Sequence, residues 1–156
     1  MSERAIGWSF VGVQALLIVA LIIVPDGDLY ELPSEARAVL DAVFWIGVAL
    51  AVAAGIALGR SLTATPVPRT EATWRTSGPY RFVRHPIYTG VVLIVIAMAV
   101  RSEHIVGLVL GGATIAFFHV KADWEEQRLA ERFSGYAEYA AHTPRFVPSP
   151  ASLTRR

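Results

Sequence analysis

Apolar residues of this chain gather in four long blocks, and charged or proline-containing sequence separates them. The blocks run from Trp8 to Val24, Val39 to Leu58, Tyr88 to Val100 and Ile105 to Val120. A membrane-spanning helix needs about 20 mostly apolar residues, and the first two blocks are close to that length. The pattern therefore predicts an all-α, polytopic membrane protein with four transmembrane helices.

The third and fourth blocks are shorter, and only the segment from Arg101 to His104 lies between them. We interpret them as a tight helical hairpin, whose helices are either extended by less apolar turns at the ends away from the hairpin turn or do not quite reach the far surface. The alternative for any single short block is a buried helix of a soluble protein. Four blocks in 156 residues, with hydrophobic residues at 54% of the chain, disfavour that alternative for the whole protein.

The charges between the blocks predict an orientation. Arginines concentrate in the segment from Gly59 to Ile87, whereas acidic residues dominate the segment from Pro25 to Ala38. Because cytoplasmic loops collect Lys and Arg, the second loop and both termini are expected in the cytoplasm. The start of the third helix and the end of the fourth then face the same compartment. The first block lacks a cleavage pattern, so we expect a retained helix in an inner or plasma membrane.

These elements predict a single integral-membrane domain over residues 1–156. Its parts are two N-terminal spans (1–58), a cytoplasmic loop (59–87), a hairpin with a C-terminal amphipathic helix (88–148) and a tail (149–156). The helix formers from Lys121 to Ala141 predict that this last helix leaves the membrane and becomes amphipathic, and the tail is expected to be mobile. The irregular loop 60–80 is long enough to favour a functional role.

Small residues recur along the second and fourth blocks. Their spacing lets helix backbones approach closely, either within one protomer, which we favour, or at a dimer seam, and the oligomeric state stays open. The residues are Gly47, Ala51, Gly55, Gly59, Gly107 and Gly111. Of the polar residues in the first two spans, Gln14 is expected to face the bundle and Asp41 the outer surface. The absence of cysteine excludes disulfides, thiolate metal sites and a cysteine nucleophile.

Candidate chemistry lies where the loop 59–87 meets the third helix. Pro86 fits the first turn of a helix, so that helix is expected to begin at His85 or Pro86. The helix N-terminus, Arg84 and His85 together suit a carboxylate or phosphate. Tyr88, in the first turn, can place a hydroxyl or a ring at the same mouth. The alternative for His85 is a simple helix cap.

The paired carboxylates Glu125 and Glu126 arrive at the same membrane face through the hairpin. Adjacent helical residues point about 100° apart, so the two are expected to have different partners. One would face the anion site and attract an ammonium or a ribose diol, and the other would bind a basic residue or water. The alternative is pairing with Arg128 or Lys121 on a solvated face.

Two motifs carry a family resemblance. They are the segment from Gly78 to Gly90, which contains Arg-His-Pro-Ile-Tyr, and the pair Glu125-Glu126. With the C-terminal stretch from Phe133 to Pro148, they resemble the superfamily of isoprenylcysteine carboxyl methyltransferases and phospholipid N-methyltransferases. The resemblance covers residues 76–148. It implies an integral-membrane enzyme that uses S-adenosyl-L-methionine.

The family pattern implies cofactor contacts at six residues, namely Arg84, His85, Pro86, Tyr88, Glu125 and Glu126. The aromatic residues expected to line the adenine slot, unless they are ordinary interfacial aromatics, are Tyr80, Phe82, Tyr136, Tyr139 and Phe146. The expected catalytic residues are Glu126 and Arg145. Arg145 would orient a polar group of the acceptor, the alternative being an arginine that only contacts lipid phosphate.

Methyl transfer from a sulfonium is a direct displacement, so alignment and exclusion of water are the expected contributions of the protein, without a metal. The expected partners are membrane lipids and a lipophilic acceptor, not nucleic acid. Prenylated protein C-termini, phosphatidylethanolamine-like amines and small hydrophobic thiols or amines all stay open as acceptors. Two alternatives remain: a sterol-type membrane reductase that uses NADPH, and a non-catalytic membrane scaffold.

Overall fold

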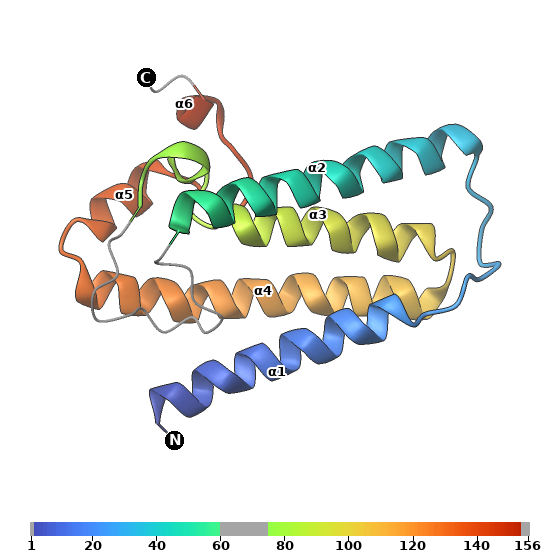
Figure 1. Ribbon diagram of the computed structural model, residues 1–156, viewed down its shortest axis with the longest axis horizontal. Coiled ribbons are helices and arrows are strands. Elements are labelled where there is room, and N and C mark those ends of the chain that lie inside the picture. Colours follow the sequence, from blue (N-terminus) through green and yellow to red (C-terminus); the bar gives the residue numbers. More distant parts are fainter. Residues whose placement is uncertain (1, 60–74, 154–156) are drawn as a thin grey trace.

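The computed structural model describes residues 2–59 and 75–153, and in these ranges all regular structure is helical. Four long helices dominate it (Figure 1): α1 (Glu3–Ile22), α2 (Ser34–Leu58), α3 (Pro86–Arg101) and α4 (Ile105–Arg132). The short elements are the 3-10 turn η2 (Gly78–Arg81) and the helices α5 (Tyr136–His142) and α6 (Pro150–Leu153). The predicted all-α class is confirmed.

Three of the described helices, α1, α2 and α4, are long and apolar enough to cross a membrane. The fourth, α3, is apolar but has 16 residues. Large apolar side chains point outward from the bundle; Leu16 is 69% exposed and Trp45 is 65% exposed. Such surfaces suit lipid better than water, so the protein is an integral membrane protein.

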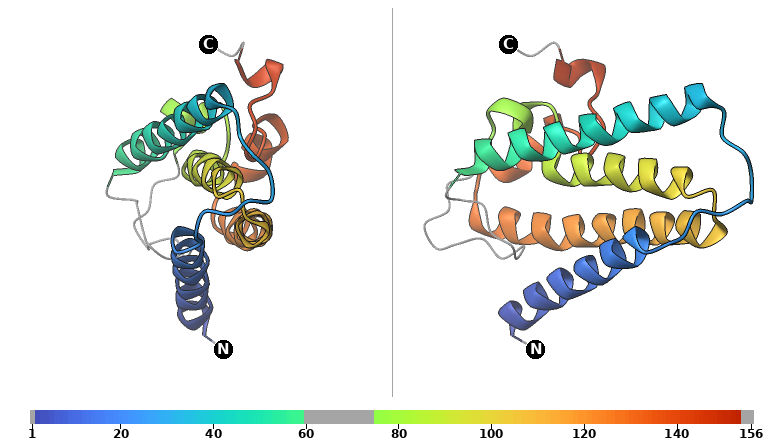
Figure 2. Two further views of the ribbon diagram at one scale, coloured as in Figure 1. Left: turned by 90° about the vertical axis from the view of Figure 1, so that its right-hand side faces the viewer. Right: turned by 45° about the vertical axis from the view of Figure 1, so that its right-hand side comes forward.

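The helices pack in the order α2, α3, α4, α1 (Figure 2). Glycines permit the closest approaches: a Cβ atom on Gly90 of α3 would lie 2.5 Å from the carbonyl oxygen of Gly47 on α2. Similarly, a Cβ atom on Gly111 would lie 2.5 Å from the Cβ of Ala99. Packing within the protomer is therefore confirmed as a role of Gly47 and Gly111.

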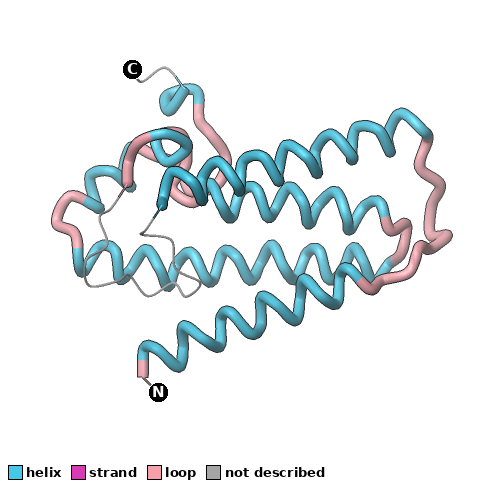
Figure 3. The backbone as a smooth tube through the Cα atoms, in the orientation of Figure 1, coloured by secondary structure: helices cyan, strands magenta, loops and turns pink. Residues whose placement is uncertain are grey.

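The loop that joins α1 to α2 hydrogen-bonds to the turn between α3 and α4. The loop and the turn lie together at one end of the bundle (Figure 3). The backbone N–H of Gly27 donates to Ser102 O at 2.7 Å, and that of Leu29 donates to Glu103 O at 2.9 Å. Glu103 is buried and forms an ion pair with Arg37. This end is held by a compact set of contacts, and the candidate chemistry lies at the other end.

The structure corrects one prediction about the C-terminal region. The helix predicted from Lys121 to Ala141 is continuous with α4 through Arg132, but it breaks between α4 and α5. Phe133 has extended backbone angles at the break, and the next residues, Ser134 and Gly135, have low helix propensity. Within the predicted tail, residues 150–153 form α6, and Ser149, just before α6, hydrogen-bonds Ser152; the mobility of the tail stays a prediction. Most of the predicted functional loop 60–80 lies outside the described residues.

Candidate functional site

The start of α3 agrees with the prediction that a helix begins at His85 or Pro86. Pro86 is the first helical residue and His85 is the N-cap residue. The His85 side chain makes no capping hydrogen bond, so the simple-cap alternative is wrong. The backbone N–H groups of Arg84 and His85 donate instead to the carbonyls of Pro144 and Arg145, at 2.8 and 3.1 Å. These two bonds fix the C-terminal segment against the mouth of α3.

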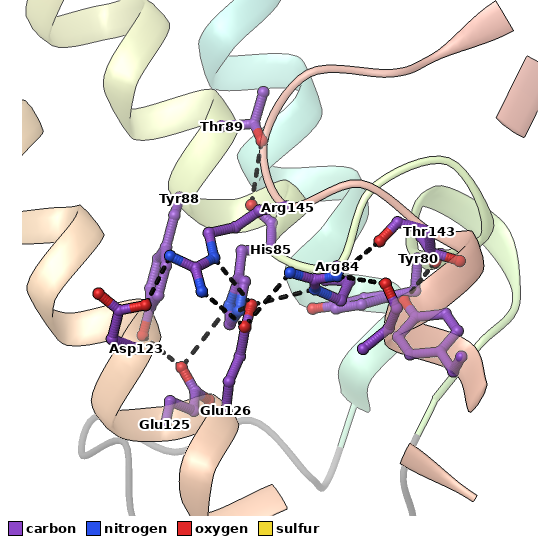
Figure 4. A network of polar contacts seen from close by, with 12 residues as sticks. Tyr80, Arg84, His85, Tyr88, Thr89, Asp123, Glu125, Glu126, Thr143 and Arg145 are labelled. Atoms are coloured by element: carbon purple, nitrogen blue, oxygen red, sulfur yellow. Dashed lines mark hydrogen bonds and ion pairs between the residues drawn. The ribbon is translucent and has the colours of Figure 1, made fainter. Parts of the chain in front are cut away.

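Glu126 is the centre of the polar network (Figure 4). Arg84 Nε donates to Glu126 Oε1 at 3.0 Å and Arg84 Nη2 to Oε2 at 3.3 Å. Arg145 makes a second two-pronged contact, at 3.1 and 2.7 Å. The Nε2 atom of His85 lies 2.8 Å from Oε1, a hydrogen bond that requires the proton on Nε2. The carboxylate bound by Arg84 and His85 is therefore the protein's own Glu126.

The remaining donors of Arg84 also have partners in the protein. Its Nη1 donates to the carbonyl oxygens of Ala140 and Thr143, at 2.6 and 2.8 Å. The guanidinium is thus surrounded by one carboxylate and two carbonyls from α4, α5 and the segment after α5. A fork of fixed N–H donors suits such a planar arrangement. Arg84 binds three parts of the chain together, so it does more than mark the cytoplasmic side by its charge.

Glu125 has a different set of partners, as the helix geometry predicts. The Tyr88 hydroxyl donates to Glu125 Oε2 at 2.8 Å, and His85 Nδ1 lies 3.8 Å from the same atom. The rings of His85 and Tyr88 are stacked, with centroids 5.1 Å apart. His85 therefore sits between the two carboxylates. The alternative pairing with Arg128 or Lys121 is not observed; Arg128 pairs with Glu3 at 3.3 Å.

Of the tyrosines predicted to line the adenine slot, Tyr80 and Tyr136 are buried and Tyr139 is partly buried. Tyr139 OH donates to the carbonyl of Tyr80 at 2.5 Å and ties α5 to η2. Burial raises the pKa of Tyr139 to about 12, and it also raises the pKa of Tyr80 and of Tyr136. The negative charges of Glu125 and Glu126 add to the last two shifts. These hydroxyls stay protonated at neutral pH.

Arg145, predicted as the acceptor-orienting residue, lies in the same network. Besides Glu126, its Nη1 contacts Asp123 Oδ1 at 2.7 Å. Hydrogen bonding to Glu126 raises the pKa of Arg145 above its ordinary value. Asp123 and His119, whose ring packs against Phe146 with centroids 4.7 Å apart, were missed in the sequence. A signal was present, because residues 119, 123 and 126 follow the three- and four-residue spacing of one helix face.

The family model for phospholipid methyltransferases matches residues 37–135. The chain belongs to the phospholipid methyltransferase family. This confirms the resemblance drawn from the Arg84–Tyr88 motif and the paired glutamates, all of which lie in the matched range. This family belongs to a group of membrane methyltransferases. Tyr136 and Arg145 lie beyond the matched range.

A relative in this comparison is the cobalt-zinc-cadmium resistance protein CzcN of Cupriavidus metallidurans. It is 36% identical over 81 residues, which make up 51% of this chain and 38% of that protein. The match thus spans well under half of the relative's length.

Proposed function

We propose that this member of the phospholipid methyltransferase family transfers a methyl group from S-adenosyl-L-methionine to a lipophilic acceptor at the cytoplasmic face of the membrane. The observation that supports it best is the network around Glu126. It joins the start of α3, the charged end of α4 and the C-terminal segment at one end of an apolar bundle. Water-soluble cofactor and membrane-borne acceptor can meet at such a boundary.

The residues at the network suit the polar groups of the cofactor. Among the described residues, the Glu125 carboxylate is contacted by Tyr88 and His85 through Oε2. Its Oε1 is then the acceptor for an ammonium or a ribose hydroxyl. The first-turn N–H groups of Ile87 and Tyr88 have no partner within the helix, by helix geometry, and suit the cofactor carboxylate.

Glu126, Arg84 and Arg145 are assigned mainly to positioning. Both oxygens of Glu126 and every guanidinium nitrogen of Arg84 are already bonded within the protein. They hold His85 in place, and Arg145 lies two residues before Val147, an apolar residue that is 76% exposed. We keep the prediction that Arg145 orients the acceptor.

The bound cofactor supplies an activated methyl group on a sulfonium. The chain's own residues bind, orient and exclude water, and these effects account for most of the rate in a direct displacement. Tyr80, Tyr136 and Phe146 are the aromatic residues proposed to flank the adenine. The protonated hydroxyls of the two tyrosines add no charge to that surface.

Binding of S-adenosylhomocysteine to the purified protein in detergent, measured by calorimetry, tests the proposal. Saturable binding is expected for the wild type. Tyr88→Phe deletes one hydroxyl bonded to Glu125 and should weaken the affinity about fivefold to tenfold, the loss of one charge-assisted hydrogen bond. The matched control is Tyr30→Phe, whose hydroxyl donates to Val100 O at the far end; its affinity should not change. Absence of binding to folded wild type, or preference for NADPH, would overturn the proposal.

The proposed topology has four spans, in one membrane domain, with both termini and the network in the cytoplasm. The chain contains no cysteine, so single cysteines can be introduced without background. Asp28 and Ser77 are exposed at opposite ends of the bundle. In intact cells, a membrane-impermeant maleimide should label Asp28→Cys and leave Ser77→Cys unlabelled until the membrane is opened. The reverse pattern would contradict the orientation.

A further inference from the structure

Lys121 is a buried cation beside the polar network of Glu125 and Glu126. It is the first charged residue after the apolar part of α4, yet only 4% of it is exposed. Its Nζ donates to Gln14 Oε1 on α1 at 2.5 Å. It also lies 5.3 Å from the ring centroid of Tyr88 and 5.9 Å from that of Phe118. The ammonium is thus placed where α1, α3 and α4 meet.

The groups in direct contact with this ammonium, Gln14 and two aromatic rings, are neutral, and the charge of Glu125 acts on it only from beyond ion-pair distance. An ammonium carries three N–H donors, and Gln14 accepts one of them. The other two point to no hydrogen-bond acceptor among the described residues, and no carboxylate there lies within ion-pair distance. Burial of a charge is costly unless an opposite charge and hydrogen bonds compensate for it. An oxyanion would supply both.

The Lys121 ammonium lies next to the candidate site. Lys121 contacts the ring of Tyr88, whose hydroxyl bonds Glu125. Gln14, which holds the ammonium, belongs to α1, outside the range matched by the family model. A contact contributed by α1 can therefore distinguish this chain from others that share the matched range.

We infer that Lys121, held by Gln14, is a specificity-determining residue that binds an oxyanion, a carboxylate or a phosphate, of the lipophilic acceptor. This rests on the proposed function, because the acceptor is defined by that reaction. The bound oxyanion need not be the group that receives the methyl. A cationic head group at the same place would be repelled by the ammonium.

The test uses amphiphiles with one alkyl chain and different head groups. Dodecanoate, dodecyl phosphate or dodecylamine is mixed at increasing mole fraction into dodecyl maltoside micelles that hold the full-length protein. The thermal unfolding midpoint then gives an apparent affinity for each probe, because a ligand that binds the folded state stabilises it. At least one anionic probe should stabilise the wild type and dodecylamine should not. The stronger of the two anionic probes identifies the head group.

Three variants separate recognition from folding. Lys121→Met keeps the length of the side chain and removes a buried charge, a change that folded proteins usually tolerate. It should lower the affinity for the anionic probe about tenfold or more, as the loss of a charge-assisted hydrogen bond implies. Lys121→Arg should retain most of the affinity. Arg4→Gln, which removes an exposed charge from α1, should leave it unchanged and so controls for surface charge.

Binding of S-adenosylhomocysteine is measured on the same preparations. Failure of that binding in the wild type would be a failure of the proposed function, and its retention in Lys121→Met is expected. The inference is overturned if Lys121→Met keeps the wild-type affinity for both anionic probes, if neither anionic probe stabilises the wild type, or if dodecylamine binds best. Equal losses in Lys121→Met and Arg4→Gln would also overturn it.

Discussion

Glu126→Gln is expected to destabilise the protein by about 3 kcal/mol and to weaken S-adenosylhomocysteine binding about tenfold or more. The Glu126 carboxylate accepts hydrogen bonds from Arg84, Arg145 and His85, so its neutral amide leaves Arg84 without its counter-charge and Arg145 with Asp123 alone. The amide nitrogen of the new glutamine would also place its N–H groups against the N–H groups of an arginine, where no hydrogen bond can form. Thermal unfolding and calorimetry in detergent measure the two effects.

The control for this variant is Glu131→Gln, on an exposed part of the same helix. It removes the same charge without touching the network, and both readouts should stay within error of the wild type. A wild-type unfolding midpoint for Glu126→Gln would show that the ion pairs do not stabilise the fold. Undiminished binding in a folded Glu126→Gln protein would remove the residue from the proposed site.

Gly90→Ala is expected to cost at least about 3 kcal/mol, at the upper end of overpacking effects, because neither neighbour can move easily. Its new Cβ atom would lie 2.5 Å from the carbonyl oxygen of Gly47 and 2.8 Å from the backbone N of Ala51. Both are backbone atoms of α2. Relief requires α2 and α3 to separate, which would also displace the start of α3. The yield of monodisperse protein and its unfolding midpoint should both fall.

Gly112→Ala makes the same chemical change on α4, where no atom lies within 4 Å of the added Cβ. It should be neutral or slightly stabilising, because alanine favours helix over glycine. If Gly90→Ala proves as mild as Gly112→Ala, the close contact of α2 and α3 is not required for folding.

Much of the fold could be predicted because its signals are local. Blocks of apolar residues gave the long helices, and Pro86 marked the first residue of α3. The break between α4 and α5 was missed, although Ser134 and Gly135 are poor helix formers, because the apolar spacing continues across it. Spacing predicts which face a residue occupies, and it does not show where the backbone turns.

The site was predicted less completely, because its geometry depends on contacts between distant segments. The sequence indicated that Arg84, His85 and the two glutamates lie at one membrane face, but it did not show that Arg84 binds Glu126. That contact depends on how the end of α5 and the residue after it surround the guanidinium, which only the folded structure shows. The pairing of Lys121 with Gln14, 107 residues apart, has no local signal at all.

The end of α5 and the segment after it contribute to the network largely through their backbone. Carbonyl oxygens of residues 140, 143, 144, 145 and 146 accept hydrogen bonds from Arg84, His85 and Thr89. Almost any amino acid offers the same carbonyl, so substitutions there, except at Arg145, should be tolerated more readily than a one-residue insertion or deletion, which would shift every acceptor. Length, more than identity, is the property that evolution would have to preserve in this stretch. A comparison that scores residue types detects such a constraint poorly.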